Sequence, residues 1–161
     1  MSTADPDRQL AAALGRVPSG LFVLTLGREG VETGMLASWV QQCSFEPPQI
    51  SVAVKPDRPV NAHLTDGASF ALNVLAEGQT DLVKHFGRGF APGEPAFEGV
   101  ALERAGDGTP VLRDALAHLV CQVAGRCSAG DHKLVIARVT GGRLHGDGKP
   151  MVHVRKSGLH Y

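Results

Sequence analysis

The sequence has few of the features that mark secreted, membrane or metal-binding proteins. Only three of its 161 residues are cysteine and none forms a C-x-x-C pair, so we expect neither a disulfide framework nor a zinc knuckle. No apolar run approaches the roughly 18 residues of a membrane span, and the N-terminus lacks a basic signal segment. We therefore expect a cytoplasmic protein in which Cys43, Cys121 and Cys127 are free thiols, buried or half-buried.

The chain also has no excess of charge of either sign. The chain has 16 basic and 16 acidic residues and a formal net charge of zero. Nucleic-acid binding and membrane-surface binding both draw on a basic surplus, so we expect neither partner. With 43% hydrophobic and 20% charged residues the composition is that of a globular protein. The length predicts a single domain over residues 1–161.

The short motifs of several enzyme classes are absent as well. The sequence contains no G-x-G-x-x-G, P-loop, H-E-x-x-H or G-x-S-x-G pattern. Its seven histidines are scattered, and no pair has metal-ligand spacing on an evident helix. We expect no metal site and no hydrolytic triad.

What is present is a series of short β-type segments separated by glycine and proline. Apolar or alternating runs predict strands at residues 21–26, 31–45, 49–55, 69–75, 111–126, 133–144 and 151–155, with a hairpin turn at 29–30. Short helices are expected from Asp5 or Asp7 to about residue 16, at 57–65 and at 80–86. Because strands and helices do not alternate strictly, we predict a mainly β fold. It is a closed antiparallel barrel of six or seven strands with about three short helices.

Three segments could carry chemistry. Residues 34–38 combine small side chains with the Ser38 hydroxyl, so a flat ring or a phosphate could approach the backbone. Lys55 and Arg58 flank the predicted start of the helix at 57–65, where cations and a helix dipole favour an anion. His132 stands where two predicted strands connect and could face a barrel mouth.

Each segment also has a purely structural interpretation. Small residues suit a twisted barrel strand, and Lys55 and Arg58 could be solvated surface cations. Asp131 could bond its own backbone in a turn that leaves His132 merely exposed. Taken singly, the residues leave both interpretations open.

Five pieces in order carry a resemblance to a known family. They are the segment at 14–25, Gly-Met-Leu-Ala-Ser at 34–38, Phe-Glu-Pro-Pro at 45–48, Phe-Ala-Leu-Asn-Val-Leu at 70–75 and Gly-Asp-His at 130–132. Together they resemble the flavin reductase-like family of FMN-binding split barrels over about residues 12–161. The segments at 35–40, 44–48 and 155–161 are similar to the flavin reductase module at the C-terminus of some flavodiiron proteins.

The resemblance implies a split, Greek-key barrel that binds FMN non-covalently near a homodimer interface. NADH or NADPH would reduce the flavin. Leu36, Ala37 and Ser38 would line the ring and the ribityl chain, and Lys55 and Arg58 would lie near the phosphate. The same end would be covered by Phe86 with Lys84 or Arg88, and His132 would face the nicotinamide as the catalytic residue.

Two positions depart from the family pattern. The family often has threonine where this chain has Leu36, so a hydroxyl contact to the ring is lost. It often has a Ser-x-Thr pair after the lysine, where this chain has Asp57, Arg58 and Pro59. One guanidinium, that of Arg58, thus replaces the hydroxyl donors to the phosphate. The Asp57 carboxylate must then point away from the phosphate or pair with Arg58.

The function implied is an NAD(P)H-dependent flavin oxidoreductase that passes electrons from a nicotinamide to flavin and on to an acceptor. That acceptor could be a monooxygenase or oxygen. An alternative is an FMN-binding electron carrier that a protein partner reduces, with little nicotinamide activity. A third is a split barrel that binds haem, another flat ligand or none. The chain could be free-standing or cut from a larger protein, and Met1 favours the first.

Overall fold

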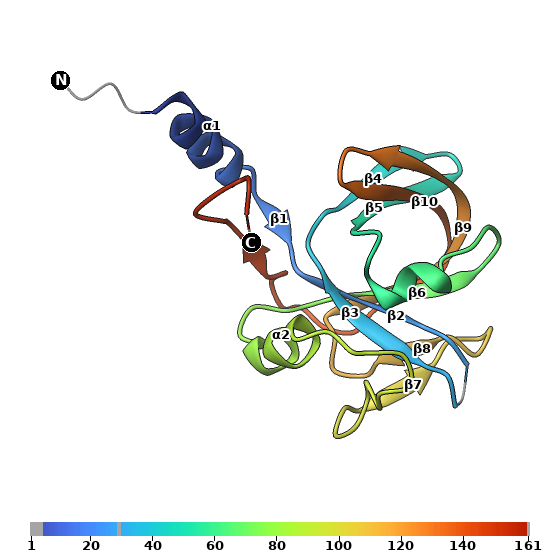
Figure 1. The fold of residues 1–161 in the computed structure, drawn as a ribbon. Helices are drawn as coiled ribbons and strands as arrows, with labels where there is room; N and C mark the ends of the chain where they lie inside the picture. The colour runs from blue at the N-terminus through green and yellow to red at the C-terminus, as the bar shows by residue number, and fades with distance from the viewer. Residues whose placement is uncertain (1–4, 29, 161) are drawn as a thin grey trace.

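A seven-stranded antiparallel sheet forms the body of the computed structural model, which describes residues 5–28 and 30–160 (Figure 1). The strand order is β3-β2-β6-β9-β10-β5-β4. The bounds are Phe22–Leu26 for β2, Thr33–Ala37 for β3, Val40–Phe45 for β4, Pro48–Val54 for β5, Ser69–Val74 for β6, Ala117–Ala129 for β9 and His132–Leu144 for β10. The prediction of a mainly β, antiparallel fold is confirmed.

The two edge strands of this sheet, β3 and β4, are neighbours in the sequence. Only Ser38 and Trp39 separate them, and two residues can bridge at most about 11 Å. The sheet must therefore curl until its edges approach each other, and Figure 1 shows this curvature. The backbone N–H of Ala53 donates to the Trp39 carbonyl at 3.0 Å, which directs the chain along β5 rather than back along β3.

Several sequence predictions need correction. No pairing joins β3 to β4 among the described residues, so the barrel is not closed as predicted. The strand predicted at 31–45 is divided at Ser38 and Trp39 into β3 and β4, and Glu29 of the predicted turn lies outside the described residues. The strand predicted at 111–126 is also divided, because a turn at residues 113–116 separates β8 from β9.

The remaining elements flank the sheet. Helix α1 spans Pro6–Gly15 and α2 spans Thr80–Gly87, whereas the helix predicted at 57–65 is only a 3-10 turn, η1, at Pro59–Ala62. The described residues thus contain two α-helices rather than about three, and neither is long and apolar enough to cross a membrane. Two small antiparallel sheets complete the fold. In one, β1 (Ser19–Gly20) pairs with β11 (Val152–His153), and in the other, β7 (Leu102–Arg104) pairs with β8 (Pro110–Leu112).

Strand β2 is buried on both faces because it separates two hydrophobic clusters. Leu24 and Leu26 face the barrel interior, whose cluster includes Phe70 and Val135. The alternate residue Val23 belongs to a second cluster that includes Phe86 of α2. The two-residue period of a strand explains this division. The second cluster fixes α2 against the outside of the barrel.

A buried polar network joins β2, β6 and β8. The Asn73 side-chain amide donates to the Val23 carbonyl at 2.8 Å and to the Thr25 hydroxyl oxygen at 3.0 Å. Its oxygen accepts from the Leu112 backbone N–H at 2.8 Å, and the Thr25 hydroxyl donates to the Pro110 carbonyl. Asn73 and Thr25 are fully buried. A buried network of this kind stabilises the fold only when every member has a partner, as here.

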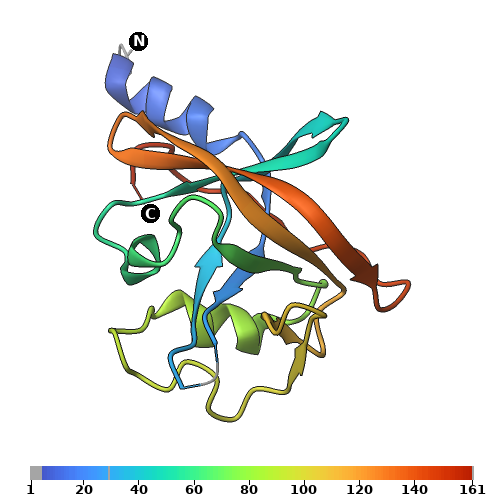
Figure 2. The same cartoon turned by 90° about the vertical axis from the view of Figure 1, so that its right-hand side faces the viewer.

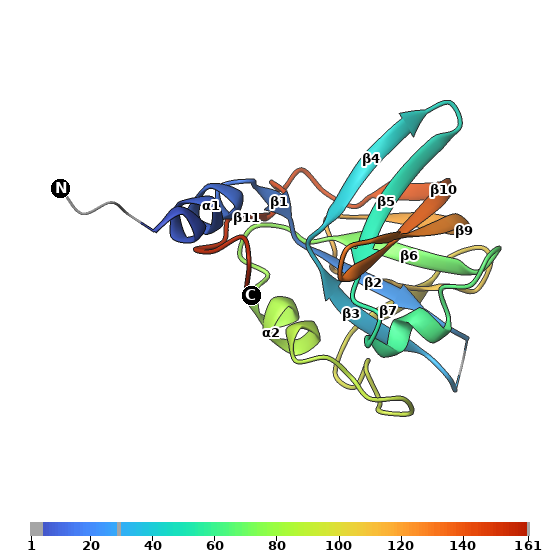
Figure 3. The same ribbon diagram turned by 45° about the horizontal axis from the view of Figure 1, so that its top comes forward.

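The two ends of the chain form an arm beside the barrel (Figure 3). The Gly158 backbone N–H donates to the Ala11 carbonyl of α1 at 2.7 Å. A Cβ at Gly158 would lie 2.0 Å from the Leu14 Cβ, so the tail and the helix approach as closely as glycine allows. Figure 2 shows the long β9–β10 hairpin crossing the body of the molecule.

The three cysteines are free thiols but only one is buried. Cys121 lies in the barrel core, and its burial raises its pKa to about 12. Cys43 and Cys127 are exposed, so the expectation of burial was wrong for both. Cys43 lies on edge strand β4, and Cys127 lies on the part of β9 that runs past the core.

Candidate functional site

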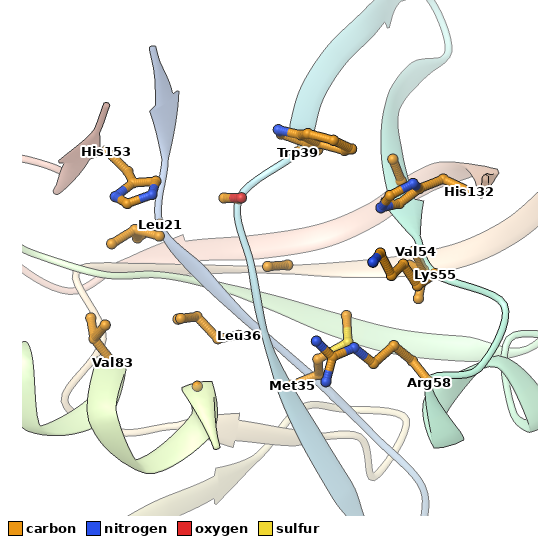
Figure 4. Close-up of a pocket in the computed structure, with 14 residues that line it drawn as sticks. Leu21, Met35, Leu36, Trp39, Val54, Lys55, Arg58, Val83, His132 and His153 are labelled. Carbon is orange, nitrogen blue, oxygen red and sulfur yellow. The ribbon is translucent and has the colours of Figure 1, made fainter. Parts of the chain in front are cut away.

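A cleft of about 270 Å³ lies where the end of β3 meets the turn after β5, the start of β10 and helix α2 (Figure 4). Its lining includes all three sequence segments singled out for chemistry, although they lie far apart in the chain. The predicted site residues that line it are Leu36, Ala37, Ser38, Lys55, Arg58 and His132.

The cleft has two walls of different chemistry. Lys55, Arg58 and His132 lie on one side, whereas Leu21, Leu36 and Val83 lie on the other (Figure 4). A planar aromatic ring is stabilised by apolar contact, and a phosphate by cations. The arrangement therefore suits a ligand with a flat ring at one end and an anion at the other.

The two cations are held by a turn rather than by a helix. The Arg58 backbone N–H donates to the Lys55 carbonyl at 3.1 Å, and the Asn61 side-chain amide donates to the same carbonyl. Since η1 is a 3-10 turn of only four residues, the helix dipole predicted here is absent, and an anion could be attracted only by the two cations themselves. Within the described residues neither cation forms an ion pair with a carboxylate, and exposed Asp57 does not pair with Arg58.

His132 is held in place at the edge of the cleft. Its side chain is 6% exposed, and its Nδ1 lies 2.7 Å from an Asp131 carboxylate oxygen. The hydrogen bond with His132 and, to a smaller extent, the charges of His132 and Lys55 lower the pKa of Asp131, and desolvation opposes them. An ionised carboxylate can only accept, so Nδ1 carries the hydrogen. Nε2 is then the nitrogen left for a ligand.

Trp39 forms the end of the cleft beside His132. The two ring centroids are 4.7 Å apart and the planes are inclined at 48°. The Arg155 guanidinium lies 4.9 Å from the centroid of the Trp39 ring, which links the C-terminal tail to the site. His153 of β11 also lines the cleft.

The other three predicted residues lie outside this cleft. Phe86 is 1% exposed and packs in the second hydrophobic cluster, with Phe90 and Phe97 ring centroids each 5.9 Å away. Lys84 is exposed on α2, and Arg88 lies over the Phe90 ring at 4.3 Å. Helical spacing explains why these three side chains miss the cleft. Residues four apart share a face of a helix, and the face of α2 toward the cleft carries Val83 and Gly87.

The sequence reasoning missed several lining residues. Trp39 directly follows the small-residue segment and is the only tryptophan, a signal that could have been used. Leu21 and His153 reach the cleft because β1 pairs with β11, a long-range contact without a local sequence signal. The remaining lining residues that were missed are Met35, Ala53, Val54, Val83 and Gly87.

Comparison with known proteins agrees with this fold. The family model described as "Flavin reductase like domain" matches residues 14–158. The chain is 44% identical over 157 residues to diflavin flavoprotein A 1 of Synechocystis sp., covering 96% of this chain and 27% of that protein. The chain thus spans about a quarter of the length of the curated relatives it matches.

Solved structures show the same architecture. An NADH:FAD oxidoreductase of Streptomyces globisporus matches with a TM-score of 0.84 and 29% identity, over 96% of this chain and 93% of that one. The flavin reductase component of a bacterial two-component tryptophan halogenase matches with a TM-score of 0.80 and 27% identity, over 91% and 92%. The resemblance seen in the sequence is confirmed, and the chain belongs to the flavin reductase like domain family.

Proposed function

We propose that the chain binds FMN in this cleft and catalyses its reduction by NADH or NADPH. The observation that carries the proposal is that Ser38 and Arg58, 20 positions apart in the sequence, line one cleft with a cationic and an apolar wall. Family membership supports a flavin cofactor and oxidoreductase chemistry. The neighbour named as an NADH:FAD oxidoreductase supports a nicotinamide donor.

The lining residues fit the parts of a flavin mononucleotide. Leu36 and Val83 would contact the ring, and Ala37 leaves room for it against the backbone of β3. The Ser38 hydroxyl would donate to ribityl or phosphate oxygens. Neither Lys55 nor Arg58 forms an ion pair with a carboxylate of the described residues, and both would hold the phosphate.

A flavin held by these residues would supply hydride and electron transfer between a nicotinamide and an acceptor. The chain's own residues would bind and orient the reactants and exclude water. His132 would orient the nicotinamide through Nε2, with its ring fixed by Asp131 and Trp39. A hydride transfer needs no general acid or base from the protein, which agrees with the absence of a triad motif from the sequence. We propose a monooxygenase or oxygen as the final acceptor and the cytoplasm as the location.

We also propose a homodimer in which a second copy covers the cleft. A cavity of about 270 Å³ is small for a ligand pocket, since pockets that enclose such ligands usually measure about 300–1,000 Å³. The arm beside the cleft exposes apolar side chains, among them Leu10, Leu14 and Val17. Twofold pairing is the commonest symmetry. Light scattering after size exclusion tests this, and a monomer that still binds FMN tightly would contradict it.

Anaerobic mixing of the FMN-loaded protein with NADH or NADPH distinguishes a flavin reductase from an electron carrier that a protein partner reduces. A reductase loses its yellow absorbance rapidly with at least one of the two donors. An electron carrier reduced by a protein partner keeps its colour with both, yet bleaches with dithionite. A protein that remains colourless after incubation with FMN would contradict both functions.

A further inference from the structure

The C-terminal tail, residues 151–160, turns alternate side chains toward the body of the molecule. Met151, His153 and Arg155 are half-buried, whereas the residues between them are exposed. Met151 packs against the second hydrophobic cluster, and His153 lines the cleft. The two-residue period of an extended chain places Arg155 on the same side. Its guanidinium lies over the Trp39 ring, 4.9 Å from the centroid.

Helix α1 holds this tail by its backbone. The Arg155 backbone N–H donates to the Gly15 carbonyl at 3.2 Å, and the Gly158 N–H donates to the Ala11 carbonyl at 2.7 Å. A Cβ at Gly15 would lie 2.7 Å from the Arg155 carbonyl oxygen, so helix and tail are in direct backbone contact there. The Arg155 side chain therefore starts from a backbone position that α1 fixes.

The indole of Trp39 connects this tail to the imidazole of His132. The Trp39 ring is half-buried at the rim of the cleft, and its centroid lies 4.7 Å from that of His132 (Figure 4). A guanidinium over an aromatic face is attracted by the ring quadrupole, so Arg155 stabilises the observed orientation of the indole. The indole in turn packs against the imidazole. Arg155, Trp39 and His132 thus form a continuous series of contacts.

We propose that Arg155 is a positioning residue for flavin reduction, which acts through Trp39 on His132. The inference rests on the proposed function, in which His132 orients the nicotinamide through Nε2. Arg155 is not among the residues that line the cleft, so its effect needs no contact with flavin or nicotinamide. The C-terminal tail then sets the geometry of the nicotinamide side of the cleft.

Tryptophan fluorescence of the flavin-free protein tests the first contact. Trp39 is the only tryptophan, so the emission reports on this ring alone. In Arg155→Gln the indole should become more accessible, with emission shifted to the red and stronger quenching by acrylamide. Arg155→Lys keeps the charge but not the planar guanidinium, and should give an intermediate result. Lys156→Gln is the control, because Lys156 is the next cation of the tail and is exposed; its emission should match the wild type.

Stopped-flow bleaching of the FMN-loaded proteins by NADH or NADPH tests the effect on the reaction. Arg155→Gln should slow flavin reduction about fivefold, the effect of losing one half-buried cation–π contact. Arg155→Lys should recover part of the rate, and FMN affinity should not change in either variant. In a Trp39→Leu background, Arg155→Gln should cause no further slowing, because the contact is already missing.

Equal slowing by Arg155→Gln in the wild type and in Trp39→Leu would show that Arg155 acts independently of Trp39, and would overturn the proposal. Unchanged fluorescence or an unchanged rate in Arg155→Gln would overturn it as well, as would an equal effect of Lys156→Gln. These results would leave the proposed function standing, whereas a wild type that neither donor reduces would contradict both. Circular dichroism of each variant checks that it is folded.

Discussion

The imidazole of His132 lies against the indole of Trp39, with ring centroids 4.7 Å apart and planes inclined at 48°. Trp39 is one of the two residues that join the edge strands of the barrel, and His132 is the first residue of β10. Their contact closes one end of the cleft. Because Asp131 holds the other side of the imidazole at 2.7 Å, the ring has little freedom to rotate.

This arrangement predicts that His132→Ala slows flavin reduction but leaves FMN bound. The phosphate and ring contacts come from other residues, whereas nicotinamide orientation is lost. Stopped-flow bleaching of the FMN-loaded protein by NADH gives the rate, and fluorescence titration gives the FMN affinity. Asp131→Asn should slow the reaction less, since the ring remains but is held by a neutral partner. An unchanged rate in His132→Ala would remove this residue from the mechanism.

Arg58→Gln should weaken FMN binding by about tenfold, the effect of losing one charge-assisted contact to the phosphate. Riboflavin has no phosphate, so its affinity should not change. Arg126→Gln is the control, because Arg126 is a β9 arginine paired with Asp66 and does not line the cleft. Calorimetric titration of both flavins measures the difference. Equal weakening of riboflavin and FMN would show that Arg58 does not act on the phosphate.

Asn73→Ala should lower the free energy of unfolding by about 3 kcal/mol. The change leaves the Leu112 N–H and the Val23 carbonyl without their side-chain partner, and each buried unsatisfied group costs about 1–3 kcal/mol. Thr25→Val leaves the Pro110 carbonyl and one Asn73 N–H without a partner, but it should cost less because valine fills the same space and opens no cavity. Urea denaturation measures both. A loss below about 1 kcal/mol in Asn73→Ala would contradict the structural role given to this network.

The pair of His118 and His145 predicts a pH dependence of stability. Their ring nitrogens lie 2.8 Å apart. Burial lowers the pKa of His118, the charges of His145 and Arg143 lower it further, and Glu103 partly opposes them. Between this lowered value and the ordinary value near 6.5, the unfolded chain binds more protons than the folded one. Stability should therefore rise with pH through that window and fall as the pH drops below about 6.5.

Thermal unfolding of the wild type and His118→Gln across this window measures the effect. The variant lacks the titrating group, so its unfolding temperature should depend less on pH than that of the wild type. An identical pH dependence in both proteins would show that His118 does not contribute.

Much of the fold followed from local patterns. Strand β6 and helix α2 lie within one residue of their predicted bounds, because alternation and helical spacing are properties of contiguous residues. The division between β3 and β4 was missed because residues 31–45 contain no proline and no turn motif. The helix at 57–65 was overpredicted, since Pro59 and Gly67 mark a start and a stop but the chain forms only one 3-10 turn between them.

The site was predictable in part for a similar reason. Ser38, Arg58 and His132 stand in segments with distinctive residue types, and the barrel brings them to one cleft. Phe86 and Arg88 were assigned to the same place because the sequence does not tell which face of α2 meets the barrel. The packing of the second hydrophobic cluster decides this, and it turns Val83 rather than Phe86 toward the cleft.

The most direct test of the account is a crystal structure of the protein with FMN. We predict the isoalloxazine ring beside residues 36–38 and the phosphate within hydrogen-bond distance of Lys55 and Arg58. A flavin bound in another cavity, or a phosphate that contacts neither cation, would contradict the central claim.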